Sequence, residues 1–422
     1  MKSIVKVSTI AMTMLVGMVQ AKTTAIINAT VYTVASQGIL EQATVIFDQD
    51  KISQVYANDN IPENLNVDET IDAKGRILTP GFIGTMNSLG LIEVSAVSRT
   101  KDGGDDKADI TFDASLAYNP KSTLVAYARK GGITSNIVAP HGGDKLFAGQ
   151  TFAVNLSGSF ASIIEKQNAV LVYLGSESKG SRARRLQELD NKFADVQKAL
   201  TKKQNSKEKE DKEKKEKKEP KRADKVIHEL LAGEKPLLAY ADRATDLLAL
   251  LALKKKYGID LILVGASDAV LVANEIAAAN VVVILSSIDN LPSSFDSINA
   301  SLTHMARLQA AGVKIILAPK GESHNVNQLR FDAGVAVANG LAKTDAIAAL
   351  TANIADVFKL NSGRIAVGKN ADLVLWSADP FELSTKVDDM WINGEKVSTR
   401  SRQDALRERY TTSSDMPRAY TK

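Results

Sequence analysis

The sequence PLLAYADRATDLLALLALKKKYGIDLILV, residues 236–264, contains a strand, a helix and a second strand in succession. Residues 236–241 and 261–264 are short apolar runs, and residues 244–255 between them have a helical pattern. A strand followed by a helix and another strand is typical of a parallel sheet covered by helices. This stretch therefore predicts an α/β fold.

The same alternation extends over residues 124–360. Further strand-like runs lie at residues 133–139, 169–174, 281–285 and 314–318, and helical patterns lie at residues 268–279 and 301–311. Together with a run that ends at Ile83, these segments approach the eight strands of a closed (β/α)8 barrel. We expect a TIM barrel over residues 81–361, with active-site groups at the carboxyl ends of its strands.

Both ends of the chain are rich in β-branched and alternating segments. Strand patterns lie at residues 25–34, 43–55 and 71–83, and again at residues 371–376 and 387–397, where Asn-Gly marks a hairpin. We expect residues 22–80 and 362–400 to form one small composite β-sandwich domain. Residues 401–422 are then a C-terminal tail.

The composition excludes several classes of site. The chain has 422 residues, 44% of them hydrophobic and 24% charged, which is ordinary for a globular protein. It has no cysteine, so disulfide scaffolds, thiol nucleophiles and cysteine-based metal sites are excluded. It has only four histidines, at positions 141, 228, 304 and 324.

Most of the positive charge lies in one segment. Residues 202–222 (KKQNSKEKEDKEKKEKKEPKR) are net +5 in a chain of net +4, so the remainder carries a net charge of −1. Lysine and glutamate alternate there without an apolar stripe, which predicts a solvated helix or a disordered insertion on the outside of the barrel. With no basic body, nucleic acid is not an expected partner.

The first residues resemble a secretory signal. Lys2 and Lys6 precede a mostly apolar stretch, residues 7–18, and the small residues Val19 and Ala21 suit cleavage before Lys22. The apolar stretch is short for a membrane span. We expect residues 1–21 to be a cleaved signal peptide and the mature protein to be periplasmic or secreted.

Two longer motifs resemble the amidohydrolase superfamily. ILTPGFIGTMNSLGL at residues 77–91 is similar to the first barrel strand of that family, where PGFID precedes His-x-His. SGRIAVGKNADLVLW at residues 362–376 is similar to its closing segment. The resemblance, to imidazolonepropionase-like metal-dependent hydrolases, covers residues 30–400. It implies a distorted (β/α)8 barrel with a β-sandwich built from both chain ends.

Members of this family usually hydrolyse C–N bonds with a water activated by one or two divalent metals such as zinc. The resemblance implies ligands from His-x-His on the first strand, Lys or Glu on the fourth, His on the fifth and sixth, and Asp on the eighth. In this chain Met86 and Ser88 occupy the His-x-His positions, and Gly84 replaces the preceding Asp. A thioether and a hydroxyl are poor zinc ligands.

The remaining ligand positions also differ. Tyr240 and Asp242 stand where close relatives carry His-x-His, Val264 replaces the sixth-strand His, and Lys320 replaces the eighth-strand Asp. The sequence does not locate the fourth-strand ligand. We therefore expect no metal cofactor, and a pocket at these former ligand positions together with His324 in the loop after the last strand.

The candidate catalytic residues are Asp242, Lys320 and Glu93. One hypothesis is that the Lys320 ammonium partly replaces the metal charge and pairs with Asp242 or Glu93; the alternative is that it extends into solvent. Glu93 and Asp242 could also act as a carboxylate pair. A serine nucleophile needs a base, and the sequence places no histidine beside Ser88.

The other histidines have structural interpretations. His141, in a glycine-rich loop, is interpreted as a locally packed residue. His228 is interpreted as an exposed residue near a helix start. His304, beside an apolar helical stripe, is interpreted as a helix-surface residue.

Three functions remain open. The first is a pseudo-enzyme that binds a small molecule or acts as a subunit in a homo-oligomer, or in a hetero-oligomer with an active paralogue. The second is a hydrolase of carbon–nitrogen bonds with an atypical site. The third is a structural protein that uses the barrel as a scaffold.

Overall fold

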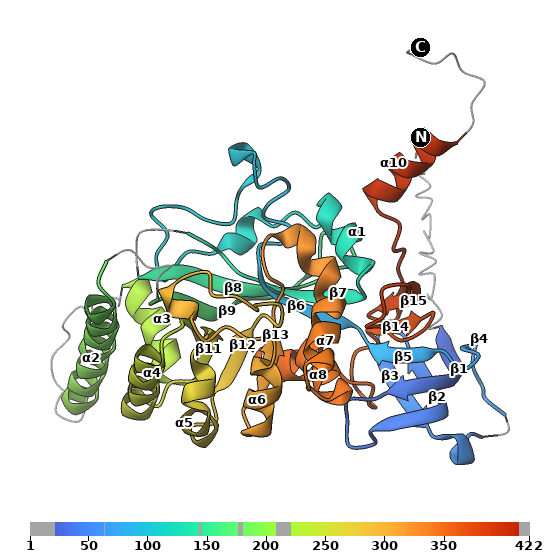
Figure 1. The fold of residues 1–422 in the computed structure, drawn as a ribbon, viewed down its shortest axis with the longest axis horizontal. Coiled ribbons are helices and arrows are strands. Elements are labelled where there is room, and N and C mark those ends of the chain that lie inside the picture. Colours follow the sequence, from blue (N-terminus) through green and yellow to red (C-terminus); the bar gives the residue numbers. More distant parts are fainter. Residues whose placement is uncertain (1–21, 63, 143–145, 176–179, 208–220, 413–422) are drawn as a thin grey trace, which may run out of the picture.

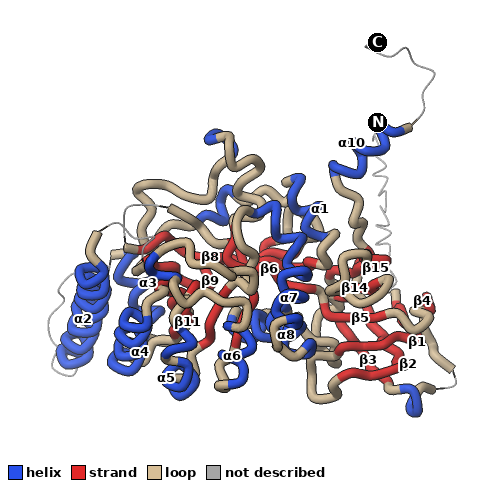
Figure 2. The backbone as a smooth tube through the Cα atoms, in the orientation of Figure 1, coloured by secondary structure: helices blue, strands red, loops and turns tan. Residues whose placement is uncertain are grey.

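The computed structural model describes residues 22–62, 64–142, 146–175, 180–207 and 221–412. The expected signal peptide and most of the charged insertion lie outside these residues. A helix-covered barrel occupies one side of the molecule, and a β-rich unit occupies the other (Figure 1). Figure 2 shows the same division as a cluster of helices around central strands beside a nearly all-strand unit.

One eight-stranded sheet forms the nearly closed barrel, in the spatial order β13-β12-β11-β10-β9-β8-β7-β6. The strands lie in chain order around it, so the predicted distorted (β/α)8 TIM barrel is confirmed. Their bounds are β6 (Phe82–Asn87), β7 (Ile133–Val138), β8 (Phe147–Asn155), β9 (Ile163–Tyr173), β10 (Leu237–Ala241), β11 (Leu261–Gly265), β12 (Val282–Leu285) and β13 (Ile315–Leu317).

The distortion lies at β8. This strand pairs antiparallel with both β7 and β9, whereas the other neighbouring barrel strands pair in parallel. An antiparallel strand needs no crossover helix, and β8 is buried along almost its whole length. The sequence pattern predicts seven of the barrel strands but not this one, because no helical pattern marks its ends.

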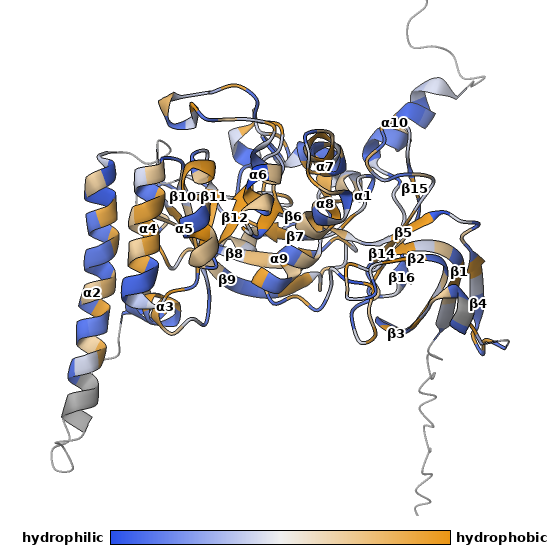
Figure 3. Cartoon of the chain, turned by 60° about the horizontal axis from the view of Figure 1, so that its bottom comes forward, coloured by the Kyte–Doolittle hydropathy of each residue, from blue (hydrophilic) through white to orange (hydrophobic). Residues whose placement is uncertain are grey.

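Helices cover the outside of the barrel strands. They are α1 (Thr123–Arg129), α2 (Arg182–Lys207), α3 (Arg222–Leu231), α4 (Ala244–Tyr257), α5 (Ala273–Ala278), α6 (His304–Ala310), α7 (Leu329–Ala338), α8 (Lys343–Leu350) and α9 (Ala352–Val357). The strands β10 to β12 are strongly apolar inside this layer, whereas α2 alternates polar and apolar residues (Figure 3).

Helix α4 shows how the sequence forms this layer. Leu247, Leu250 and Leu253 are buried and lie three residues apart, so they share the face that packs inward. Gly258 ends the helix in the left-handed conformation, at φ 71°. Three lysines in the last turn favour the negative end of the helix dipole.

The second sheet combines strands from both ends of the described chain. Its order is β16-β15-β14-β5-β1-β2-β3, with β4 paired to β1. The strands are β1 (Thr23–Tyr32), β2 (Ile39–Asp48), β3 (Lys51–Tyr56), β4 (Glu69–Asp72), β5 (Ile77–Pro80), β14 (Leu373–Trp376), β15 (Val387–Ile392) and β16 (Glu395–Lys396). We call it the composite sheet.

Trp376 joins the composite sheet to the barrel. Its ring is fully buried, lies 5.3 Å from the ring of Phe82 on β6, and donates a hydrogen bond of 2.8 Å from Nε1 to Thr79 Oγ1. Gly132, at φ 78°, makes room for this ring, since a Cβ there would lie 2.3 Å from Trp376 Cη2. The indole therefore fixes the position of the first barrel strand.

The expected C-terminal tail begins with a helix. Helix α10 (Arg402–Thr411) is capped by Ser401 and Asp404. It is held to the barrel by Lys130 Nζ, which donates hydrogen bonds of 2.7 Å to both Asp404 carboxylate oxygens. Among the residues that the structure describes, no helix is long and apolar enough to cross a membrane.

Candidate functional site

The carboxyl ends of the barrel strands open into two adjoining pockets. One, of about 320 Å³, lies over β6 and β7, and the other, of about 590 Å³, lies over β10 to β13. We call them the first and second pocket, and their union the barrel mouth. The side chains common to both pockets are those of Met86, Tyr173 and Tyr240.

The floor of the mouth is set by strand register. Tyr240 pairs with Tyr173 of β9 on one side and with Val264 of β11 on the other. Residues in register on parallel strands point to the same face. The two tyrosine rings accordingly stack, with centroids 4.8 Å apart and planes 13° from parallel. Tyr173 ends the fourth barrel strand, the strand on which the sequence did not locate a ligand position.

The end of the first strand is organised by a pair of amides. Asn87 and Asn136 exchange two side-chain hydrogen bonds, of 2.8 and 3.1 Å, and both residues are buried. Gly84 makes this possible, because a Cβ there would lie 2.2 Å from Asn136 Oδ1. Where the resemblance implies an Asp, Gly84 therefore leaves a space that the paired amides occupy.

This strand end brings Ser88 to His141. Ser88 Oγ lies 3.2 Å from His141 Nδ1 and 3.1 Å from the carbonyl oxygen of Ala139. The expectation that no histidine lies beside Ser88 is therefore wrong. Ser88 follows β6 and His141 follows the neighbouring parallel strand β7, so the two loops meet at the same edge of the barrel. That adjacency was the signal that could have revealed the pair.

The environment of His141 favours the neutral ring. Burial, and secondly the charge of Lys101, lower the pKa of His141. Its backbone N–H donates to the carbonyl oxygen of Gly103 at 2.9 Å. A neutral imidazole can accept a proton, which a lysine or arginine at the same place could not do.

Lys320 pairs with a residue that the sequence did not single out. Its ammonium forms an ion pair with Asp289, in the loop after β12, and the lysine side chain is 50% exposed. The hypothesis of pairing with Asp242 or Glu93 is replaced by this partner. The strand preceding Asp289 is the neighbour of β13, so the two loops lie side by side.

Asp242 and Glu93 are engaged at different places. Asp242 accepts hydrogen bonds from Ser267, 3.2 Å from its N–H and 2.9 Å from its hydroxyl. Burial raises the pKa of Asp242 in spite of these bonds. Glu93 instead accepts bonds from Asn119 and from Thr123, at the start of α1, and lines neither pocket. The structure does not bring the two together as a carboxylate pair.

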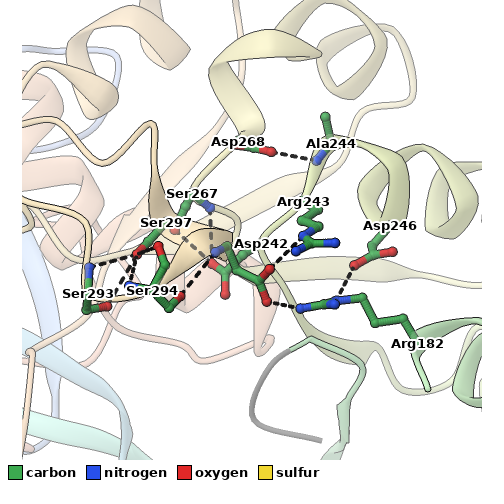
Figure 4. Close-up of polar contacts among 11 residues, drawn as sticks. Arg182, Asp242, Arg243, Ala244, Asp246, Ser267, Asp268, Ser293, Ser294 and Ser297 are labelled. Carbon is green, nitrogen blue, oxygen red and sulfur yellow. Dashed lines mark hydrogen bonds and ion pairs between the residues drawn. The ribbon is translucent and has the colours of Figure 1, made fainter. Parts of the chain in front are cut away.

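An ion cluster lies next to Ser294, which lines the second pocket (Figure 4). Asp296 is buried and binds two cations, Arg182 at the start of α2 and Arg243 before α4, the latter through Nε at 2.6 Å. Arg182 also lies 3.5 Å from Asp246. We call these four residues the Arg182 cluster. It ties the loop after β12 to the loop after β10, and so fixes one wall of the mouth.

Two histidines lie elsewhere than expected. His304 is not on the helix surface: it is 6% exposed, its ring bonds to the backbone of Asn299, and it lines the second pocket. The loop before α6 covers it. His324 is exposed, lies 3.4 Å from Glu322, and lines neither pocket. Of the expected pocket residues, Met86, Ser88, Tyr240, Asp242, Val264 and Lys320 do line the mouth.

The donor set does not suit the family's metal. The former ligand positions present a thioether, a hydroxyl, a phenol, an aliphatic side chain and an ammonium, with Asp242 as the one carboxylate among them, where a borderline divalent ion needs several imidazoles and carboxylates. His141 and His304 also line the mouth, but the His141 ring contacts Ser88 and the His304 ring bonds to the backbone of Asn299. Within the described ranges, no three His, Asp or Glu side chains gather closely enough to hold a metal ion.

Comparison with known proteins shows what this chain and its architecture are similar to. The sequence model described as the amidohydrolase family matches residues 209–397. No curated protein matches the chain. The structure of an amidohydrolase from Thermotoga maritima MSB8 superposes with a TM-score of 0.79 at 23% identity, covering 89% of this chain and 100% of that one.

Two other solved structures share the fold at lower similarity. Beta-aspartyl dipeptidase from Fervidobacterium islandicum AW-1 gives a TM-score of 0.54 at 14% identity, covering 89% of this chain and 96% of that one. Triazine hydrolase from Arthobacter aurescens gives 0.53 at 15% identity, covering 92% and 97%. At these identities the similarity shows the fold, and function has to be argued from the site.

Proposed function

We propose that this chain is a ligand-binding member of the amidohydrolase superfamily that works without the metal ion of that superfamily; the match of residues 209–397 to the amidohydrolase family and the shared fold support this proposal. It is then a pseudo-enzyme, in the sense that it does not hydrolyse a substrate with a water molecule activated by a metal ion. The barrel mouth holds a small polar molecule, either for the protein itself or for an assembly in which the protein is a subunit.

The observation that carries this proposal is the ion pair of Lys320 and Asp289. Lys320 stands where the resemblance implies a metal-binding Asp. The ammonium has no lone pair with which to bind a metal ion, and it engages Asp289, the neighbouring carboxylate that such an ion would otherwise use. The ion pair is neutral as a whole, so it leaves no net negative charge there to attract a divalent cation.

The mouth retains the features of a small-molecule site. The stacked pair of Tyr173 and Tyr240 supplies an apolar floor, and serine hydroxyls and the Asp242 carboxylate supply polar contacts around it. Binding sites of this kind are concave, apolar at the base and lined by a few oriented polar groups. Dipeptides and cyclic amides, the usual substrates of the superfamily, are the first ligands to try.

The compartment and the partners are further parts of this proposal. The signal-like residues 1–21 support a periplasmic or secreted protein. A subunit without its own metal chemistry suits a hetero-oligomer with an active paralogue, or a homo-oligomer. Intact mass of the exported protein and native mass of the purified assembly measure these two properties directly.

A second candidate is a hydrolase of carbon–nitrogen bonds with an atypical site. It is supported by the names of two structural neighbours, a beta-aspartyl dipeptidase and a triazine hydrolase. These names describe those proteins, and the strand-end residues of this chain differ from the pattern that the family's metal chemistry needs.

Metal content separates the two candidates. The purified protein is loaded with zinc or manganese, desalted and measured by elemental mass spectrometry. The proposal expects less than about a tenth of an equivalent. One or two equivalents that are lost on Asp242→Asn would overturn it and make the hydrolase the better candidate.

Ligand binding is tested separately, by thermal shift with dipeptides and cyclic amides. A stabilising compound should lose its effect in Tyr240→Ala, which removes half of the stacked floor. Tyr410→Ala is the matched control, because Tyr410 is exposed on α10, away from the barrel mouth. If no compound stabilises the wild type and a native mass measurement finds a monomer, the binding function is contradicted.

A further inference from the structure

The role of the Ser88–His141 pair depends on which of the two side chains donates the hydrogen bond between them. The serine hydroxyl has one hydrogen, and two acceptors lie within reach, the Ala139 carbonyl oxygen at 3.1 Å and His141 Nδ1 at 3.2 Å. If it donates to the carbonyl, Nδ1 must carry a hydrogen and donate to Oγ. If Nδ1 is unprotonated, the hydroxyl donates to the ring instead. The second arrangement is that of a serine beside a general base.

The position of the imidazole ring is fixed by two glycines. A Cβ on Gly103 would lie 2.8 Å from His141 Cε1 and Nδ1, and a Cβ on Gly104 would lie 1.9 Å from the His141 carbonyl oxygen. The loop that carries Gly103 also accepts the backbone hydrogen bond of His141. The loop after β6 and the loop after β7 therefore pack closely enough to hold the ring against Ser88.

The pair borders a cavity with a charge beside it. Ser88 and His141 both line the first pocket, of about 320 Å³, which also contains Lys101. The charge of Lys101 acts on the His141 ring. A positive charge at this place can stabilise the negative oxygen that forms when a nucleophile adds to a carbonyl group. The pocket therefore combines a hydroxyl, a base and a cation.

We propose that Ser88 is a nucleophile activated by His141, which transfers the acyl group of a small ester or amide in the first pocket. The serine proton moves to Nδ1 while Oγ bonds to the carbonyl carbon. The C–O or C–N bond to the leaving group then breaks, and the imidazolium protonates that group. Water hydrolyses the acyl-serine and returns the proton through His141. This chemistry goes beyond ligand binding and needs no metal.

A fluorophosphonate probe tests the proposal, because it reacts with serines that a base activates and releases fluoride. The purified full chain is treated with the probe, digested, and the adduct located by peptide mass spectrometry. We expect an adduct on Ser88, at a rate at least tenfold lower in His141→Gln. Ser88→Ala should remove it. Ser95→Ala is the matched control, since Ser95 lines the same pocket but bonds to Glu322.

A second variant tests the proposal even if His141→Gln does not fold. Gly103→Ala retains both reacting side chains but displaces the imidazole ring, so labelling should slow while the melting temperature shows a folded protein. The proposal is overturned if Ser88 is not labelled, if the label falls on Ser95, or if neither His141→Gln nor Gly103→Ala slows the reaction. Such results would leave the metal-free binding function standing, since metal content and thermal shift test it independently.

Discussion

Lys320 and Asp289 form an ion pair across the carboxyl ends of two neighbouring barrel strands, β13 and β12. The pair occupies the place where the superfamily resemblance implies a metal-binding carboxylate. Half of the lysine side chain and about a third of the aspartate side chain remain exposed. Its main effect is therefore on the charge at the barrel mouth, because an exposed pair adds little to stability.

Replacement of Lys320 by Met tests how much this ion pair contributes to stability. We expect the free energy of unfolding to change by less than about 1 kcal/mol, since exposed ion pairs are weak and screened by salt. Urea unfolding of wild type and Lys320→Met measures it, with Asp289→Asn as the matched variant. A loss above about 2 kcal/mol would mean that the pair is structural.

Asp296 should behave differently, because its carboxylate is 3% exposed and faces Arg182 and Arg243. Asp296→Ala removes the carboxylate that both arginines share and leaves Arg182 with Asp246 alone. Breaking a buried pair costs about 3 to 5 kcal/mol, and the partial exposure of both arginines reduces this to about 2 to 3. Urea unfolding measures the loss. Glu408→Ala, which breaks the exposed pair with Arg400, is the control and should cost under about 0.5 kcal/mol.

The fold was predictable because its signals are local. The leucine spacing of α4 and the apolar runs of β10 to β13 follow from residues close together in the chain. Strand β8 was missed for the complementary reason. It is antiparallel and joined to β7 and β9 without helices, so nothing local distinguishes residues 147–155 from the glycine-rich loop before them.

The site was less predictable because its contacts are distant in sequence. Ser88 and His141 are 53 positions apart, and Lys320 and Asp289 are 31 apart. The resemblance to the superfamily predicts which ligand positions differ, at Met86 and Ser88 for example. It could not say which new partners the changed side chains would find, because that depends on how loops from neighbouring strands pack.

Asp332 gives a prediction about pH. Burial, and secondly the charge of Asp289, raise the pKa of Asp332 to about 7. In the unfolded chain the group titrates near 4. Between about pH 4 and 7 the folded state therefore keeps a proton that the unfolded state has lost, so this group makes stability fall as pH rises through that range and stay level above it.

Asp332→Asn should remove this slope. A pKa shift of three units corresponds to about 4 kcal/mol, and access of water to the carboxyl group reduces this value. We therefore expect the free energy of unfolding of the variant, relative to that of the wild type, to rise by about 2 kcal/mol from pH 4 to pH 8. Urea unfolding at both pH values measures the gain. Asp260→Asn, at an exposed position, is the control. An equal difference at both pH values would contradict the titration.

Gly132, beside Trp376 where the barrel meets the composite sheet, and Gly258, at the end of α4, distinguish the cost of packing from the cost of backbone strain. Both have a left-handed backbone, at φ 78° and 71°. A Cβ on Gly258 meets no atom within 4 Å, so Gly258→Ala carries only the conformational cost of about 1 kcal/mol. A Cβ on Gly132 would strike the fully buried Trp376 ring, so we expect Gly132→Ala to lose about 3 to 4 kcal/mol.

Tryptophan fluorescence during urea unfolding reports both the loss of stability and the displacement of the Trp376 ring. If the two variants lose equal stability, Trp376 does not fix the first barrel strand, and the position of Ser88 at its end must depend on the Asn87–Asn136 amide pair instead.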